Sequence, residues 1–241
     1  MITARHLTKA YGRGVAARTV LDGVDLDIEA SMLTAIIGPS GSGKSTLLFC
    51  LSGLESSSGG EVDLLGADPA RARPGRMARL YRERVGFVFQ EYNLIPYLSA
   101  RRNAALPGLL AHRPDAVSRA DSALSELGLS EHASTRASRL SGGQQQRTAL
   151  ARVLAGRPEV VFADEPTGAL DTAASAVVMG GLRARADEGA AVVLVTHDLD
   201  AAALADRVVL LRDGRIQGVH GRSSAPELAG LLEGEDAGAQ R

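Results

Sequence analysis

The segment that decides the fold spans residues 38–45 and reads Gly-Pro-Ser-Gly-Ser-Gly-Lys-Ser. It fits the pattern G-x-x-x-x-G-K-[ST] at every position, and it follows an apolar run at 33–37 that favours a strand. A helical pattern starts at Ser45. Because glycine lacks a Cβ, such a loop can turn consecutive N–H groups toward phosphate oxygens at the start of the helix. We therefore predict a phosphate-binding loop; the alternative is a Gly/Ser surface turn.

Two side chains of this loop have a chemistry of their own. Lys44 is expected to contact the β and γ phosphates of a nucleoside triphosphate, and the Ser45 hydroxyl is expected to bind a magnesium ion. The residues predicted to hold ATP in this part of the chain are Gly38, Pro39, Ser40, Gly41, Ser42, Gly43, Lys44, Ser45 and Thr46.

Two acidic residues end another apolar run. Residues 160–163 read Val-Val-Phe-Ala, and Asp164 and Glu165 follow them. Neither carboxylate can be buried cheaply without a cation or a proton. Asp164 is suited to hold magnesium through a coordinated water, and Glu165 is suited to take a proton from an attacking water. The alternative is an acidic turn at a strand end, which the neighbouring phosphate motif makes less attractive.

A histidine and a glycine pair are further candidates. His197 follows the apolar run at 191–195, and open α/β sheets bind their ligands at the carboxyl ends of parallel strands. Ser141 precedes Gly142 and Gly143 where a helical pattern starts, so it can cap that helix while the free N–H groups form a second anion site. Taken alone, these features are also consistent with a packed histidine and an ordinary helix start.

Apolar patterning predicts an α/β fold. Continuous apolar runs at 33–37, 160–163 and 191–195 are typical of parallel strands buried on both faces. Alternation at 24–28 suggests a half-exposed strand of an antiparallel sheet. Residues 91–157 show helical spacing without a convincing strand, which predicts a helical insertion. Further short strands are expected at 2–7, 62–65, 85–89 and 208–211.

We expect one domain over residues 1–222 and, over 223–241, a short capped helix followed by a disordered tail. The formal net charge is −1, so no global positive field attracts nucleic acid or anionic lipid. Apolar runs are far shorter than the ~18–20 residues that cross a bilayer, and the amino terminus has no apolar signal core. We therefore expect a cytoplasmic chain that reaches a membrane through a partner. The single cysteine, Cys50, has apolar neighbours and is expected to be buried and inert.

Taken together and in this order, the motifs resemble the ATP-binding subunit of ABC transporters over about residues 1–220. Gln90 matches the Q-loop of that family, and Tyr11 matches the aromatic residue that stacks on adenine. The other matching elements are Walker A at 38–45, the signature Leu-Ser-Gly-Gly-Gln at 140–144, Walker B at 160–165, the D-loop Gly-Ala-Leu-Asp at 168–171 and the switch histidine at His197.

The resemblance implies a P-loop NTPase core with a parallel sheet, a small antiparallel β subdomain and a helical insertion. It also implies a head-to-tail dimer that holds two ATP molecules between its subunits, with Glu165 and His197 as catalytic residues. The magnesium ligands would be Ser45, Gln90 and Asp164. The residues that would contact ATP in trans are Ser141, Gly142, Gly143, Gln144 and Asp171.

Within the family, residues 89–96 and 163–171 look most like the branch that serves macrolide exporters, lipoprotein-releasing systems, bacitracin-type peptide exporters and the cell-division ATPase. This implies a homodimer on the cytoplasmic face of the membrane. It would drive a separately encoded permease that exports a drug, peptide or lipid-like substrate or transmits force. The rival hypothesis is a soluble ABC-type ATPase that acts on nucleic acid or the ribosome. Such proteins generally carry two cassettes, a long coiled-coil insertion or a basic surface, and none of these occurs in the sequence, so no nucleic acid partner is expected.

Overall fold

A six-stranded sheet is the centre of the computed structural model, which describes residues 1–12, 17–168 and 170–236. Its strand order is β5-β6-β7-β3-β8-β9; the first five strands run parallel and β9 pairs antiparallel with β8. The strands are β3 (Met32–Ile37), β5 (Val85–Val88), β6 (Val160–Asp164), β7 (Ala191–Val195), β8 (Arg207–Arg212) and β9 (Arg215–His220). The predicted parallel core is confirmed.

Helices cover both faces of this sheet, and each face has its own hydrophobic core. On one face, Leu47 of α1 (Lys44–Ser52) belongs to the same cluster as Phe162. On the other face, Val161 shares a cluster with Leu150 of α5 (Gly142–Gly156) and Leu182 of α6 (Thr172–Asp187). Successive strand side chains point to opposite faces, so a sheet covered on both sides requires the uninterrupted apolar runs seen in the sequence.

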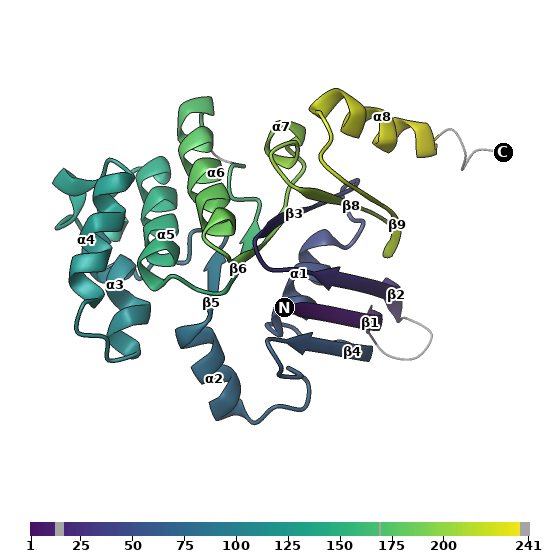
Figure 1. Ribbon diagram of the computed structural model, residues 1–241, viewed down its shortest axis with the longest axis horizontal. Helices are drawn as coiled ribbons and strands as arrows, with labels where there is room; N and C mark the ends of the chain where they lie inside the picture. Colours follow the sequence, from purple (N-terminus) through teal and green to yellow (C-terminus); the bar gives the residue numbers. More distant parts are fainter. Residues whose placement is uncertain (13–16, 169, 237–241) are drawn as a thin grey trace.

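A second, antiparallel sheet confirms the expected β subdomain. Its order is β2-β1-β4, and Figure 1 shows it next to α1, below β3, β8 and β9. These strands are β1 (Ile2–Tyr11), β2 (Arg18–Ile28) and β4 (Gly59–Leu64). β1 and β2 are longer than the runs at 2–7 and 24–28 that patterning predicted. Their extra residues pair across the hairpin up to Tyr11 with Arg18, although they are mostly exposed or half-buried and carry little apolar signal.

The helical insertion lies on one side of the molecule, where α3, α4 and α5 pack against one another and α6 lies next to α5 (Figure 1). Besides α5, its helices are α3 (Ala100–Leu110) and α4 (Ala116–Glu126), preceded outside the expected range by α2 (Pro74–Glu83). Asn103 is fully buried in α3, and its side chain bonds the backbone of Ile95, Leu98 and Ser99. These bonds fix the loop that leads from β5 into the insertion.

The carboxyl-terminal part returns to the sheet. The short helix α7 (Leu199–Ala202) precedes β8 and β9. Apolar patterning does not predict the edge strand β9, because its alternate residues are only half-buried. α8 (Ala225–Asp236) lies where a short capped helix was expected, and the N–H and the hydroxyl of Ser224 both donate to Glu227, at 2.7 and 2.8 Å. Leu228 is fully buried against the core. The expected disordered tail includes 237–241, which lie outside the described residues.

Two further expectations concern accessibility. Cys50 is 2% exposed, and burial raises the pKa of its thiol to about 11, so the thiolate needed for reaction is suppressed. Throughout the described ranges, every helix is too short or too polar to pass through a lipid bilayer.

Candidate nucleotide site

Three neighbouring strands of the parallel sheet end at the candidate site. Ile36 of β3 pairs with Val195 of β7, and Val195 pairs with Asp164 of β6. The phosphate motif, Glu165 and His197 each begin one or two residues after these paired positions. They therefore lie at the same edge of the sheet. This is the carboxyl edge, where such sheets bind ligands.

The phosphate motif forms the predicted loop and helix. Gly43 has φ 100° and caps α1 without a side-chain hydrogen bond, so the first N–H groups of the helix stay available to an anion. Gly38 cannot carry a side chain, because a Cβ there would clash with the carbonyl oxygen of Leu211. The glycines thus serve close packing at one position and a left-handed backbone at the other.

Lys44 lies over this loop. Its Nζ donates to the carbonyl oxygens of Gly38 and Pro39, at 2.8 and 3.0 Å. Burial lowers the pKa of the ammonium, while the carboxylates of Glu165 and Asp164 oppose that shift. The half-buried ammonium of Lys44 can exchange these carbonyl acceptors for the oxygens of a phosphate group.

Ser45 and Asp164 come together across 119 residues of sequence. The Ser45 hydroxyl donates to Oδ1 of Asp164 at 2.9 Å. Burial raises the pKa of Asp164, the bond from Ser45 opposes this, and the charge of Glu165 raises it further. Hydroxyl and carboxylate oxygens suit Mg²⁺, which usually keeps waters and substrate phosphates among its ligands. Nowhere in the described part of the chain do three or more His, Cys, Asp or Glu residues gather around a possible metal, so an ion here would need those additional ligands.

Glu165 is held by the neighbouring strand end. Its Oε2 lies 2.9 Å from Nδ1 of His197 and accepts bonds from the Thr196 hydroxyl at 3.3 Å and the His197 N–H at 3.4 Å. The backbone at Glu165 has φ 46°, a strained conformation for a residue with a side chain. The Glu165 side chain is 14% exposed and that of His197 72%. The strained turn therefore directs a nearly buried carboxylate at an accessible imidazole.

Gln90 and Tyr11 approach the site from its two sides. Gln90 follows β5 two residues after Val88, which pairs with Ala163, so it leaves the same sheet edge as Glu165. Tyr11 ends β1, and its hydroxyl is in hydrogen-bonding contact with Thr46 on α1. Both candidates thus lie at the border of the candidate site.

A pair of charged residues fixes the Tyr11 ring. The Tyr11 hydroxyl donates to Oε2 of Glu55 at 2.7 Å, and Lys9 Nζ lies 2.9 Å from Oε1 of the same carboxylate. Lys9 Nζ also lies 4.8 Å from the centre of the Tyr11 ring, so one ring face is covered by a cation. Tyr11 is 42% exposed, which leaves ring surface for a flat ligand.

The signature segment lies elsewhere in the chain. Ser141 caps α5 in a reciprocal arrangement: its hydroxyl accepts from Gln144 N at 3.3 Å, and Gln144 Oε1 accepts from Ser141 N at 2.9 Å. α5 packs on the face of the sheet opposite to α1. Asp171 caps α6, accepting from Ala174 N at 2.7 Å. Among the residues that the structure describes, no hydrogen bond or ion pair joins 141–144 or Asp171 to 38–46.

Several residues of the site were not sequence candidates. Thr196 holds Glu165, and Lys9 with Glu55 holds Tyr11. Gln146 is 1% exposed and donates to the carbonyl of Pro166 at 2.6 Å, which links the signature helix to the segment after Glu165. Lys9 could have been found, because it lies two residues before Tyr11 on one strand and so on the same face. The other contacts join distant parts of the chain and leave no local pattern.

The fold and the site define a P-loop nucleotide-binding protein: a phosphate loop, a lysine and an acidic strand end meet at the carboxyl edge of a parallel sheet. The model of the ABC transporter family matches residues 21–168. The chain therefore belongs to the ABC transporter family, as its ATPase cassette.

Relatives and solved structures agree with this assignment. The macrolide export ATP-binding/permease proteins MacB of Neisseria meningitidis and Nitrosomonas europaea are 43% and 47% identical over 95% and 90% of this chain. The chain spans 35% and 33% of their length, about a third. The ATP-binding cassette MJ0796, a dimer in a post-hydrolysis state bound to ADP and phosphate, is 35% identical with a TM-score of 0.86. The match covers 93% of this chain and all of that one. The fold and the resemblance to the macrolide-exporter branch are confirmed.

Proposed function

We propose that two copies of this chain pack head to tail, hydrolyse two Mg²⁺–ATP molecules between them, and drive a membrane permease that exports a drug, peptide or lipid-like substrate or transmits force. The observation that carries the proposal is the position of the two helix starts suited to phosphate. The helices that they begin, α1 and α5, pack on opposite faces of one sheet. We therefore expect the two helix starts to reach the same nucleotide from two copies. A nucleotide that bridges two copies binds the closed pair better than the open one, which is all a ligand needs to drive closure.

Each residue then has a task that follows from its environment. Lys44 exchanges carbonyl oxygens for phosphate oxygens, and Tyr11 receives adenine on its uncovered face. Glu165 takes the proton of the attacking water, and His197, which it contacts, holds the γ phosphate and that water in register. Ser45, Asp164 and Gln90 would hold the magnesium ion, which supplies positive charge to the phosphate oxygens.

Ser141 tests the trans site without loss of the helix cap. Both Asp and Asn cap helices as well as Ser does, but Asp also places a negative charge where the partner's phosphate would bind. We expect Ser141→Asp to lower ATP hydrolysis at least ~10-fold, and Ser141→Asn to retain most of it. ATP affinity of the monomer, measured with a fluorescent nucleotide, should be the same in both. Equal hydrolysis by the two variants would argue against a site shared between copies.

Tyr11 tests the adenine platform. Stacking of a base on an aromatic ring contributes about 1–3 kcal/mol, so Tyr11→Ala should weaken ATP binding roughly 10-fold or more. Tyr11→Phe keeps the ring and loses only the contacts of the hydroxyl with Glu55 and Thr46, and it should bind within a few-fold of the native chain. Titration with inorganic tripolyphosphate, which has no base, should give the same affinity for all three proteins. Loss of tripolyphosphate binding by Tyr11→Ala would mean that the ring supports the phosphate loop instead.

A groove next to Gln90 is the surface that fits the permease. It lies between β5 and the insertion, has a volume of about 190 Å³, and includes Phe89 and Asn93 on either side of Gln90. Arg152 of α5 holds the following loop through the carbonyl oxygens of Asn93 and Tyr92, at 2.8 and 3.2 Å. A Cβ on Gly142 would lie 3.1 Å from the Tyr92 hydroxyl, so the same loop borders the signature glycine. Movement in the groove would therefore reach both halves of the nucleotide site.

Single cysteines can test this docking surface in membranes, since native Cys50 is buried and its thiol is suppressed. We expect Arg82→Cys at the groove to cross-link to a multi-spanning protein, or to a multi-spanning part of a longer chain as in the ATP-binding/permease relatives. Leu204→Cys is the control, because Leu204 is 50% exposed and does not line the groove. Cross-linking from Leu204→Cys alone would place the partner on another face. Recovery of a nucleic acid or ribosomal partner in place of a membrane protein would favour the rival hypothesis and a location away from the cytoplasmic face of the membrane.

A further inference from the structure

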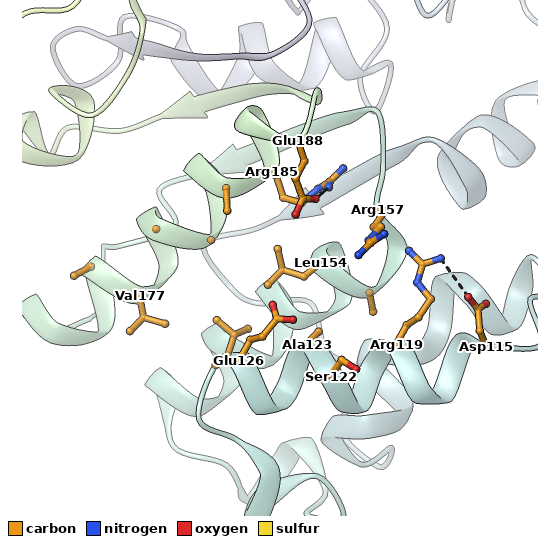
Figure 2. Close-up of a pocket in the computed structure, with 16 residues that line it drawn as sticks. Asp115, Arg119, Ser122, Ala123, Glu126, Leu154, Arg157, Val177, Arg185 and Glu188 are labelled. Atoms are coloured by element: carbon orange, nitrogen blue, oxygen red, sulfur yellow. Dashed lines mark hydrogen bonds and ion pairs between the residues drawn. The ribbon is translucent and has the colours of Figure 1, made fainter.

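A hollow of about 600 Å³ lies between α4, α5 and α6 (Figure 2). None of the residues that line it belongs to the nucleotide site, the signature segment or the groove beside Gln90. The hollow and the groove share helix α5, but they involve different residues of it. Its volume falls in the range of about 300–1,000 Å³ that is typical of small-molecule sites. The nucleotide chemistry described above makes no use of it.

Three guanidinium groups from three elements meet at one end of this hollow. Arg119 comes from α4, Arg157 directly follows α5 as its C-cap, and Arg185 lies in the last turn of α6. Figure 2 shows Arg119 and Arg157 next to each other, with Arg185 near them. Their mutual closeness is also evident in the pKa of Arg119: burial lowers it, Asp115 opposes the shift, and the charges of Arg113, Arg157 and Arg185 lower it further.

The hydrogen-bonding capacity of these groups is only partly used. Arg185 has a side chain 8% exposed and bonds Glu188 and the carbonyl of Pro158, yet its Nε is buried without a partner. Nη2 of Arg119 is likewise buried and unpartnered, and its Nη1 is 3.8 Å from Asp115. Within the described ranges, the guanidinium of Arg157 makes no hydrogen bond or ion pair. Unpaired buried donors leave the charge of Arg119 and Arg185 poorly compensated. The exposed guanidinium of Arg157 beside them can bind an oxyanion in the hollow directly.

The carboxylates of the hollow are distributed unevenly. Asp115 and Glu188 face the arginines and are their partial counterions. Glu126 lies at the other end, as Figure 2 shows. Leu154, Val177 and Gly180 also line the hollow, and Figure 2 shows Leu154 between the arginines and Glu126. The arginine end therefore suits an oxyanion, and the rest of the hollow suits a small body with apolar surface and a hydroxyl toward Glu126.

We propose that this hollow is a second ligand site, which binds the phosphate group of a small phosphate monoester through Arg119, Arg157 and Arg185. The planar guanidinium forks match phosphate geometry, and three of them can surround one phosphate group. The site is independent of the proposed ATPase cycle, because its residues take no part in the nucleotide site.

The test uses the full chain with its phosphate loop first saturated by Mg²⁺ and a non-hydrolysable ATP analogue. Glycerol 1-phosphate, with inorganic phosphate for comparison, is then titrated and followed by calorimetry. We expect saturable binding of glycerol 1-phosphate with a Kd below about 1 mM, and at least ~10-fold weaker binding to Arg157→Gln. Arg157 is exposed, and among the described residues its guanidinium has no partner, so its replacement should leave the fold intact. Arg102→Gln makes the same charge change at an exposed position of α3 that does not line the hollow, and this variant should bind normally.

A second variant fills the hollow without removing charge. A Cβ at Gly180 meets no atom within 4 Å, so Gly180→Leu can extend into the space without a backbone clash. It should abolish binding while the affinity for the ATP analogue is unchanged. The proposal is overturned if glycerol 1-phosphate shows no saturable binding up to about 10 mM, or if Arg157→Gln and Gly180→Leu bind it as well as the native chain does. Inorganic phosphate binding as tightly as the ester would restrict the site to the free ion and would contradict the monoester assignment.

Discussion

Glu165→Gln is expected to lower steady-state ATP hydrolysis by about 10²- to 10⁴-fold, the usual contribution of a general base, while ATP still binds. The amide has nearly the same shape as the carboxylate and can keep its contacts with Thr196 and His197, but it cannot accept a proton from water. Because hydrolysis reopens the proposed dimer, this variant should accumulate as a dimer when ATP is added. Phosphate release and size-exclusion chromatography with light scattering measure the two effects.

The same strand supplies a matched control for this variant. Glu159 precedes β6 at its opposite end, and its carboxylate pairs with Arg84 at 2.6 Å away from the site. Glu159→Gln should hydrolyse ATP at the native rate and stay monomeric after turnover. Normal hydrolysis by Glu165→Gln would remove Glu165 as the base. A variant with ATP bound that remains a single copy, its pocket completed by its own residues, would refute the shared site.

Lys44→Ala is expected to weaken ATP binding itself, by roughly 10- to 100-fold, which corresponds to the 1.5–3 kcal/mol of a hydrogen bond to a charged group. The loss has two sources in the structure. The ammonium that would contact the β and γ phosphates is absent, and Asp164 and Glu165 lose the cation that offsets their charge toward the incoming phosphates. Equilibrium titration with a fluorescent nucleotide measures this effect directly.

Lys44→Arg separates charge from geometry at the same position. It keeps the positive charge, but the guanidinium is too large for the place where Nζ lies within 3.0 Å of two loop carbonyls, so we expect intermediate affinity. Thermal unfolding without nucleotide should show that both variants are folded. Native affinity in Lys44→Ala would mean that backbone N–H groups alone hold the triphosphate, and it would exclude Lys44 as a phosphate ligand.

Much of the fold was predictable because its strongest signals are local. Residues 38–45 predict a loop between a strand and a helix, since few sequences provide glycines, a lysine and a serine at that spacing. The runs at 160–163 and 191–195 predict buried parallel strands, because only a sheet covered on both faces tolerates unbroken apolar sequence. Patterning did not predict β9 or the outer halves of β1 and β2, because their residues are mostly exposed or half-buried and carry no periodic apolar pattern.

The candidate site residues could likewise be predicted from the sequence, because most of them directly follow predicted strands. The side chains that contact them could not be predicted. From residue types and spacing alone came the phosphate loop, the acidic pair and the capped helix at Ser141, because each depends on a few consecutive residues. Only the tertiary structure brings Glu55 to the Tyr11 hydroxyl, Thr196 to the Glu165 carboxylate and three arginines to one hollow. Those contacts join strands and helices far apart in the chain. These contacts depend on strand register and on the packing of the whole core, so they cannot be predicted from any local stretch of sequence.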